Sequence, residues 1–418
     1  MKTIKTYKIL NIRYLIFFLI LLSTTMHSQS LEDYLSIAAK NNPSIKASYA
    51  KFEAALQKSP QVSSLPDPNL TLSVFGRMIE TRVGSQEARF SLMQMFPWFG
   101  TLAAKENVAN LIAEASFQNY ISTKNEVFFN IKKVYAEIYE VTQQIMLEEE
   151  NLAILNSYKE LALSKFKNGK GAMVDVLRID LKRNASETTT QLLKDKKDPL
   201  TTQFNSLLNR TTSDEIFASN LTAFEDDFSI KNNDSLLQYN SKLLSLSKKK
   251  EAFEAQQLVI KKEGNPMIGL GIDYSIISKR DIPNLEMNGQ DAIMPMISVS
   301  LPIFRKKHKA MQKEIAFMVD ATNFEKQALE NELASNFAQA SYVVKKSKRL
   351  KELYETQLKT TQQAIQLLIS AYSNSGSNFE EILSLNQDVL GLKIAIITAT
   401  KDDFTSQAQL DYLLSKEK

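Results

Sequence analysis

The chain has 418 residues, with 51 Lys and Arg, 47 Asp and Glu, two His and no Cys. The lack of Cys excludes a disulfide framework and a thiolate metal site, and two histidines leave almost no basis for a His-based catalytic or zinc site. Gly and Pro are scarce and no Gly/Ser linker divides the chain, which favours elongated elements over separate globular domains.

Residues 1–28 have the pattern of a secretory signal peptide, because four basic residues precede the apolar run from Tyr14 to Leu22 and polar residues follow it. The apolar run is too short to span a bilayer. No Cys follows it, so we expect a mature protein that is not a lipoprotein. Removal of the four basic residues leaves 47 side chains of each sign, and this neutral balance predicts no nucleic-acid partner.

The first structural repeat is expected over residues 29–209. It begins with a helical region from Ser30 to Ser59, which we expect to break at Asn42-Pro43. Alternation of apolar and polar residues then predicts a β-hairpin over 69–96, with strands of a length that crosses an outer membrane.

A long helix is predicted over residues 101–168, because no Gly or Pro interrupts this stretch. Apolar residues from Val127 to Ile145 follow each other at alternating spacings of four and three, which is a heptad seam. At 1.5 Å per residue the helix would be about 100 Å long, too long for a globular domain. A return helix is expected over residues 173–209.

The same plan occurs a second time. A short mixed segment over 210–234 leads to the second repeat, 235–418, with a helix, a β-hairpin over 266–301, a long helix over 305–375 and a return helix over 378–415. Asn42 and Asn240, and Pro68 and Pro266, are related by the same offset along the chain, so an internally duplicated fold is predicted.

Four membrane strands are too few to close a barrel. An open sheet in lipid would leave backbone groups at its edges unpaired, at several kcal/mol each, so several chains must share one barrel. Three chains would supply twelve strands, within the known size range. The alternative is a pair of small hairpins that pack on a soluble helical bundle.

The whole mature sequence resembles the TolC-type outer membrane factors, and is most similar to their heavy-metal and cation efflux branch. The resemblance is carried by the start of the first strand, by the turns between strands and long helices, and by the two helix tips. The residues concerned are Pro68-Asn69-Leu70, Phe96-Pro97-Trp98-Phe99-Gly100, Leu301-Pro302-Ile303-Phe304, Phe166-Lys167-Asn168-Gly169 with Asp175-Val176-Leu177, and Tyr372-Ser373-Asn374-Ser375-Gly376 with Glu381-Ile382-Leu383.

This resemblance implies a mainly α fold with membrane β: a homotrimer with a twelve-stranded barrel on a periplasmic tunnel of helices. It implies a passive exit duct of a tripartite efflux or type I secretion system in the outer membrane of a Gram-negative-type bacterium. Its partners would be outer membrane lipid, a periplasmic adaptor (a membrane fusion protein) and, through the adaptor, an inner-membrane pump. The exported substrate would be selected by the pump and adaptor.

Three groups of site residues are expected. The helix tips that meet the adaptor in the resembled family correspond to Asn168, Gly169, Lys170, Ser375, Gly376 and Asn378. Candidates for an acidic ring at the periplasmic aperture are Asp175, Glu380 and Glu381, although Ser384 stands where an acid is usual in the family. The turns between barrel and helices are marked by Pro97, Trp98, Gly100, Pro302 and Phe304.

Other interpretations remain open at this point. A periplasmic or secreted coiled-coil scaffold without a pore would have the same heptads. Methionines cluster around both hairpins, which is compatible with soft-metal transit, but adaptable packing is the favoured interpretation. Trp98 fits an interfacial aromatic belt or plain packing equally well. No nucleophile, phosphate-binding loop or cofactor motif stands out, so we expect no enzyme activity and no cofactor.

Overall fold

The structure is a computed structural model that describes residues 30–218, 220–221, 237–375 and 379–415. The expected signal peptide, most of the mixed segment and the tip residues Gly376 and Asn378 lie outside the described residues. The main elements are α2 (Leu31–Asn41), α3 (Pro43–Leu56), α4 (Lys58–Ser63), β1 (Asn69–Thr81), β2 (Gly84–Phe96), α5 (Thr101–Lys167), α6 (Met173–Leu208), α8 (Ser241–Glu263), β3 (Met267–Ser278), β4 (Ala292–Ser300), α9 (Arg305–Ser375) and α10 (Phe379–Leu413).

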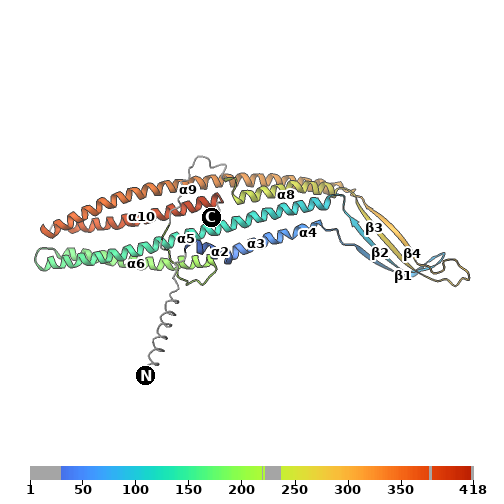
Figure 1. Cartoon of the computed structure of the whole chain (residues 1–418), viewed down its shortest axis with the longest axis horizontal. Helices are drawn as coiled ribbons and strands as arrows, with labels where there is room; N and C mark the ends of the chain where they lie inside the picture. Colours follow the sequence, from blue (N-terminus) through green and yellow to red (C-terminus); the bar gives the residue numbers. More distant parts are fainter. Residues whose placement is uncertain (1–29, 219, 222–236, 376–378, 416–418) are drawn as a thin grey trace, which may run out of the picture.

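The molecule is a long rod with the sheet at one end and the two helix tips at the other (Figure 1). The helices α5 and α9 run the full length of the helical part. Beside the sheet, α3 and α4 lie along α5, and α8 packs against both α5 and α9; in the other half, α6 lies along α5 and α10 along α9. The expected fold class, mainly α with four strands, is confirmed.

The first helical region is broken twice rather than once. The expected break at Asn42-Pro43 is present, and the Asn42 side chain caps α3 by accepting hydrogen bonds from the backbone N–H groups of Ser44 and Ile45. A second break falls at Gln57, between α3 and α4. Pro60 accounts for it, because its ring would clash with the carbonyl four residues earlier in a continuous helix.

The four strands form one antiparallel sheet in the order β1-β2-β3-β4, so the two hairpins pair through β2 and β3. The first hairpin is tight, since Thr81 pairs with Gly84 and only two residues separate the strands. Within the chain, β1 and β4 each pair with one strand only, which leaves an unpaired edge on both sides of the sheet.

One face of the sheet is almost entirely apolar. The cross-strand register joins Leu72, Phe90, Tyr274 and Ile293 into one row across all four strands. These side chains are 60%, 39%, 39% and 65% exposed in the single chain. Further members of this face are Leu70, Val74, Leu92, Ile268, Leu270, Ile272, Ile297 and Val299.

Among the described residues, four buried clusters hold the helices together, and the smallest joins α5 to α8. One joins α2 to α5 and α6, a second joins α9 to α10, and a third lies at the helix tips and joins α5 and α6 to α9 and α10. In the heptad seam of α5, Ile131 and Ile138 lie in the cluster of α2, α5 and α6, and Val141 is also completely buried. The seam ends before the tip, where Phe166 is 43% exposed.

Candidate functional site: helix tips and barrel turns

The tip between α5 and α6 is a tight turn built around one glycine. Gly169 has a φ of 70°, a left-handed conformation that side chains with a Cβ atom disfavour. Its N–H donates to the Phe166 carbonyl at 3.0 Å, and the Lys170 N–H donates to the Lys165 carbonyl at 2.9 Å. These two bonds form a Schellman motif that ends α5, while the Asn168 side chain donates to the Ser164 carbonyl.

The tip of the second half packs directly on the first. Tyr372 near the end of α9 and Phe379 at the start of α10 are buried, with ring centroids 4.9 Å apart. They belong to the cluster that also holds Val176 and Ile179 of α6. The backbone of Ser375 ends α9, and Gly376 and Asn378 lie outside the described residues.

Lys165 connects the two tips. Its ammonium lies 4.0 Å from the centre of the Tyr372 ring and donates a hydrogen bond to the Tyr372 carbonyl. The Tyr372 hydroxyl is buried and has no hydrogen-bond partner among the described residues. Burial, assisted by the negative charge of Asp175, raises the pKa of this hydroxyl.

Two of the three predicted aperture carboxylates are held by one arginine. Arg178 of α6 lies 2.9 Å from the Glu380 carboxylate of α10 and 3.9 Å from that of Asp175. Glu381 is exposed and forms no ion pair with any residue the structure describes. Sequence reasoning missed Arg178, although its position three residues after Asp175 is a recognisable helix-pair signal.

A groove beside this pair runs between α6 and α10, with a volume of about 400 Å³. Ser384 lines it, opposite Leu181 and Lys182. Lys182 donates a hydrogen bond to Gln387 at 3.0 Å across the groove. Arg178 and Glu380 belong to its lining, so one of the three predicted aperture residues shares this surface with Ser384.

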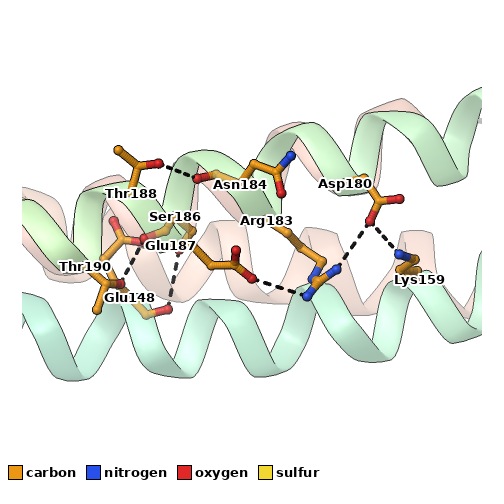
Figure 2. Close-up of polar contacts among 9 residues, drawn as sticks. All are labelled: Glu148, Lys159, Asp180, Arg183, Asn184, Ser186, Glu187, Thr188 and Thr190. Carbon is orange, nitrogen blue, oxygen red and sulfur yellow. Dashed lines mark hydrogen bonds and ion pairs between the residues drawn. The ribbon is translucent and has the colours of Figure 1, made fainter.

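Farther from the tips, polar side chains fasten α6 to α5 (Figure 2). Lys159 lies 2.6 Å from the Asp180 carboxylate, which Arg183 also contacts at 3.3 Å. The Lys159 hydrogen bond, followed by that from Arg183, lowers the pKa of the Asp180 carboxyl. Farther along the two helices, Ser186 donates a hydrogen bond to the buried carboxylate of Glu148.

This buried polar group extends to the second half of the chain. Asn151 donates to Ser186 at 3.2 Å, and Asn386 of α10 donates to Asn151 at 2.9 Å. All four side chains, including Glu148, are at most 5% exposed. Since buried polar groups need partners, the network fixes how α5, α6 and α10 align.

The turns between strands and long helices expose aromatic side chains. Gly100 has a φ of 73° at the start of α5, and the Thr101 N–H donates to the Trp98 carbonyl. Trp98 is 38% exposed and Phe99 is 77% exposed. In the second half, Pro302 and Phe304 occupy the corresponding turn, and Phe304 is 82% exposed.

Two further observations concern the rest of the described chain. Among the described residues, no group of three or more His, Cys, Asp and Glu side chains is arranged to hold a metal ion. One described helix, α10, is long and apolar enough to cross a bilayer. It packs along α9 and α5, so we assign it to the helical wall.

No family model and no curated protein matches the sequence. Solved outer membrane channels match over nearly the whole chain. The outer membrane protein VceC of Vibrio cholerae is 15% identical, with 92% of this chain and 96% of VceC covered and a TM-score of 0.75.

Two further solved outer membrane channels match the structure of this chain. CusC, in a structure describing transmembrane channel formation, is 12% identical, with 94% of both chains covered and a TM-score of 0.79. The open-state MtrE channel of Neisseria gonorrhoeae is 14% identical, with 93% of this chain and 89% of MtrE covered and a TM-score of 0.74. The chain thus has the fold of the TolC-type outer membrane channels that its sequence resembles.

Proposed function

We propose that the protein is a passive exit duct in the outer membrane, assembled as a homotrimer whose strands form one barrel. The observation that carries this proposal is the sheet: one almost entirely apolar, exposed face and two unpaired edges in the same chain. In lipid, the apolar face is favourable and the edges must be paired. Three copies joined edge to edge satisfy both requirements at once.

The arrangement of the helices supports an orientation. The exposed aromatic side chains Trp98, Phe99 and Phe304 lie where the strands meet the helices. Aromatic side chains of this kind favour the boundary between lipid and water. The helical part would then stand in the periplasm, with the tips at Gly169 and Ser375 directed towards the adaptor and pump of a tripartite efflux or type I secretion system.

The duct acts without chemistry of its own. It would be driven by an inner-membrane pump reached through a periplasmic adaptor, and the Asp175, Glu380 and Glu381 carboxylates would lie near its narrow end. A soluble coiled-coil scaffold would leave the apolar face of the sheet in water, where contiguous patches of this size are rare.

Cell fractionation and mass measurement test the proposal. The mature protein should be extracted from membranes only with detergent and should have the mass of a trimer once the detergent is subtracted. Reconstitution into planar bilayers should give discrete conductance steps. A stable monomer in the soluble periplasmic fraction would refute the duct and favour the scaffold.

Binding of the adaptor to the helix tips is tested in a separate experiment. The partner that copurifies after mild cross-linking would be identified, and its binding to the purified trimer measured. Gly169→Trp should weaken this binding several-fold while leaving the barrel trimeric. Phe166→Trp, an exposed aromatic substitution on the preceding turn of α5, controls for added bulk alone.

A further inference from the structure

The start of α9, directly after the sheet, is strongly basic. Five of its first nine residues are basic and none is acidic, and the first acid of the helix, Glu314, comes only after them. All five basic side chains are exposed in the single chain, and none forms an ion pair with a residue that the structure describes. We call this set the basic collar. It consists of Arg305, Lys306, Lys307, Lys309 and Lys313.

The end of α8 extends the cationic surface. The last turn of α8 packs against the first turn of α9, since a Cβ atom on Gly264 would lie 3.9 Å from the His308 ring. This turn adds Lys261, which is exposed, and Lys262, which donates a hydrogen bond to the Phe99 carbonyl at 3.1 Å. The cations therefore lie on two neighbouring helices and reach the turn that carries the exposed Phe99 side chain.

Apolar side chains border the collar on the side of the sheet. Leu301, Ile303 and Phe304 come just before Arg305 and are 67%, 70% and 82% exposed. The surface thus changes from apolar to cationic within a few residues, at the point where the sheet meets the helices (Figure 1). A membrane surface changes in the same order, from acyl chains to headgroups, and the long stems of Lys and Arg can keep the charge at headgroup level.

The stability of α9 does not explain the collar. Cations in the first turn of a helix interact unfavourably with the helix dipole, and like charges on neighbouring turns repel each other. Close by, the chain does balance a cation of its own, because Lys105 of α5 lies 2.7 Å from the Glu263 carboxylate of α8. No described acid does the same for the collar, so its charge is available to a partner outside the chain.

We propose that the basic collar binds the headgroups of anionic phospholipids in the membrane leaflet that faces the periplasm. Clusters of Lys and Arg beside a membrane attract anionic lipid. Successive helix residues are about 100° apart, so Arg305, Lys306 and Lys307 point in three directions, and some of them face the surrounding lipid in any rotational setting of α9. The inference rests on the proposed function in one respect: the sheet must lie in a membrane.

Native mass spectrometry of the mature trimer in detergent tests the collar. The trimer is mixed with equal amounts of phosphatidylglycerol and phosphatidylethanolamine that have the same acyl chains. The unmodified protein should retain phosphatidylglycerol preferentially. The variant Arg305→Gln/Lys306→Gln/Lys307→Gln should lower this preference at least roughly fivefold, the effect of one Lys or Arg near an anionic surface. Gln forms helices about as well as Lys and Arg, so folding is expected to be preserved.

The matched control is Lys345→Gln/Lys346→Gln/Lys348→Gln. It removes the same charge from the same helix, about 60 Å closer to the tips. These three side chains are also exposed and form no ion pair with the described residues. This variant should keep the lipid preference, and so should Lys306→Arg/Lys307→Arg, which conserves the charge. Equal retention of phosphatidylglycerol by the collar variant and the control, or no preference in the unmodified protein, would overturn the proposal.

Two other occupants of the collar are outcomes of the same experiment. An excess of inorganic phosphate should not displace phosphatidylglycerol, because the lipid also holds the protein through its acyl chains; displacement would indicate a site for free anions. The collar variant should still form trimers in detergent without phospholipid. If it does not, the cations serve the contact between copies of the chain. Either result would overturn lipid binding.

Conductance separates this inference from the proposed function. Preferential retention of phosphatidylglycerol without conductance steps in planar bilayers would refute the duct and leave the collar standing. Normal conductance without a lipid preference would refute the collar and leave the duct standing.

Discussion

Asn42 and Asn240 make the same pair of interactions in the two halves of the chain. Each caps the helix that follows it, α3 or α8, through its side-chain oxygen. Each also donates from its side-chain nitrogen to a carbonyl at the end of a return helix: Asn42 to Leu207 at 2.8 Å, and Asn240 to Leu413 at 2.9 Å. Both side chains are buried, at 4% exposure. The duplication therefore extends to individual hydrogen bonds.

Replacement of either residue by Asp separates the two interactions. Asp keeps the capping oxygen but has no N–H to donate, so the Leu207 or Leu413 carbonyl loses its partner. We expect Asn42→Asp and Asn240→Asp each to lower the free energy of unfolding by about 1–3 kcal/mol, the range for a buried group left unpaired. Denaturant unfolding in detergent measures it. A large effect in only one half would show that the halves are not energetically equivalent.

The Arg178 ion pairs predict an effect on ion selectivity. Arg178→Gln would leave the charges of Asp175 and Glu380 uncompensated, so the preference for cations over anions should rise. Glu380→Gln/Glu381→Gln should lower that preference and weaken block by trivalent cations. Reversal potentials in a salt gradient measure both. Lys194→Gln removes an exposed cation that pairs with Glu149, away from the tip, and should have no effect. Identical selectivity in all three would place the aperture elsewhere.

Substitution of Gly169 is expected to strain the backbone without disturbing the packing of side chains. A Cβ atom at this position would meet no atom within 4 Å, so only the φ of 70° opposes substitution. Gly169→Ala should lower the free energy of unfolding by about 1–2 kcal/mol. Gly169→Asn should cost less, because Asn tolerates the left-handed region. Thermal unfolding of the three proteins distinguishes these cases, and equal stability of all three would show that the turn relaxes to another conformation.

Asp180 predicts a dependence of stability on pH. The hydrogen bond from Lys159 holds the pKa of the Asp180 carboxyl below its ordinary value of 3.8. A carboxyl with a lowered pKa stabilises the fold above that ordinary value, and the contribution disappears as the pH falls through the lowered pKa. Asp180→Asn should therefore unfold at a lower temperature than the unmodified protein at pH 7.

The difference should shrink as the pH falls below about 4. The contribution is small and sensitive to salt, because the Asp180 side chain is 35% exposed. Melting temperatures at several pH values and at low ionic strength measure it. A difference that stays constant down to pH 2 would show that the carboxylate charge is not responsible.

A lysine is expected to destabilise the protein on one face of β1 and to be tolerated on the other. Leu72 lies in a row of apolar side chains, and the adjacent Thr71 lies on the other face, opposite Ser91. Leu72→Lys should destabilise the folded protein in lipid by about 2–4 kcal/mol, the cost of a lysine on the lipid face near the bilayer centre. Thr71→Lys on the other face should be tolerated. Refolding into lipid vesicles compares the two, and equal tolerance would contradict a lipid-facing apolar surface.

The kind and order of the elements follow from local sequence pattern. Alternating polarity in Leu70, Leu72 and Val74 predicts a strand, and an uninterrupted heptad seam predicts the long helix α5. Both patterns act through neighbours along the chain, so a sequence alone carries them. The fold agrees with the resemblance of the sequence to the outer membrane factors. The second break at Gln57 was not predicted; it occurs because the Pro60 ring is incompatible with a continuous helix at this point.

The tertiary structure decided how distant segments meet. Arg178 joins Asp175 to Glu380 of the other half, Lys165 covers the Tyr372 ring, and Met93 and Met95 of β2 lie against the glycines of β3. Apart from the spacing of Asp175 and Arg178 within α6, none of these contacts can be recognised from neighbouring residues, because each depends on the alignment of two packed helices or on the register of paired strands. The sequence by itself determined which elements form; only their packing determined which side chains lie close enough to interact.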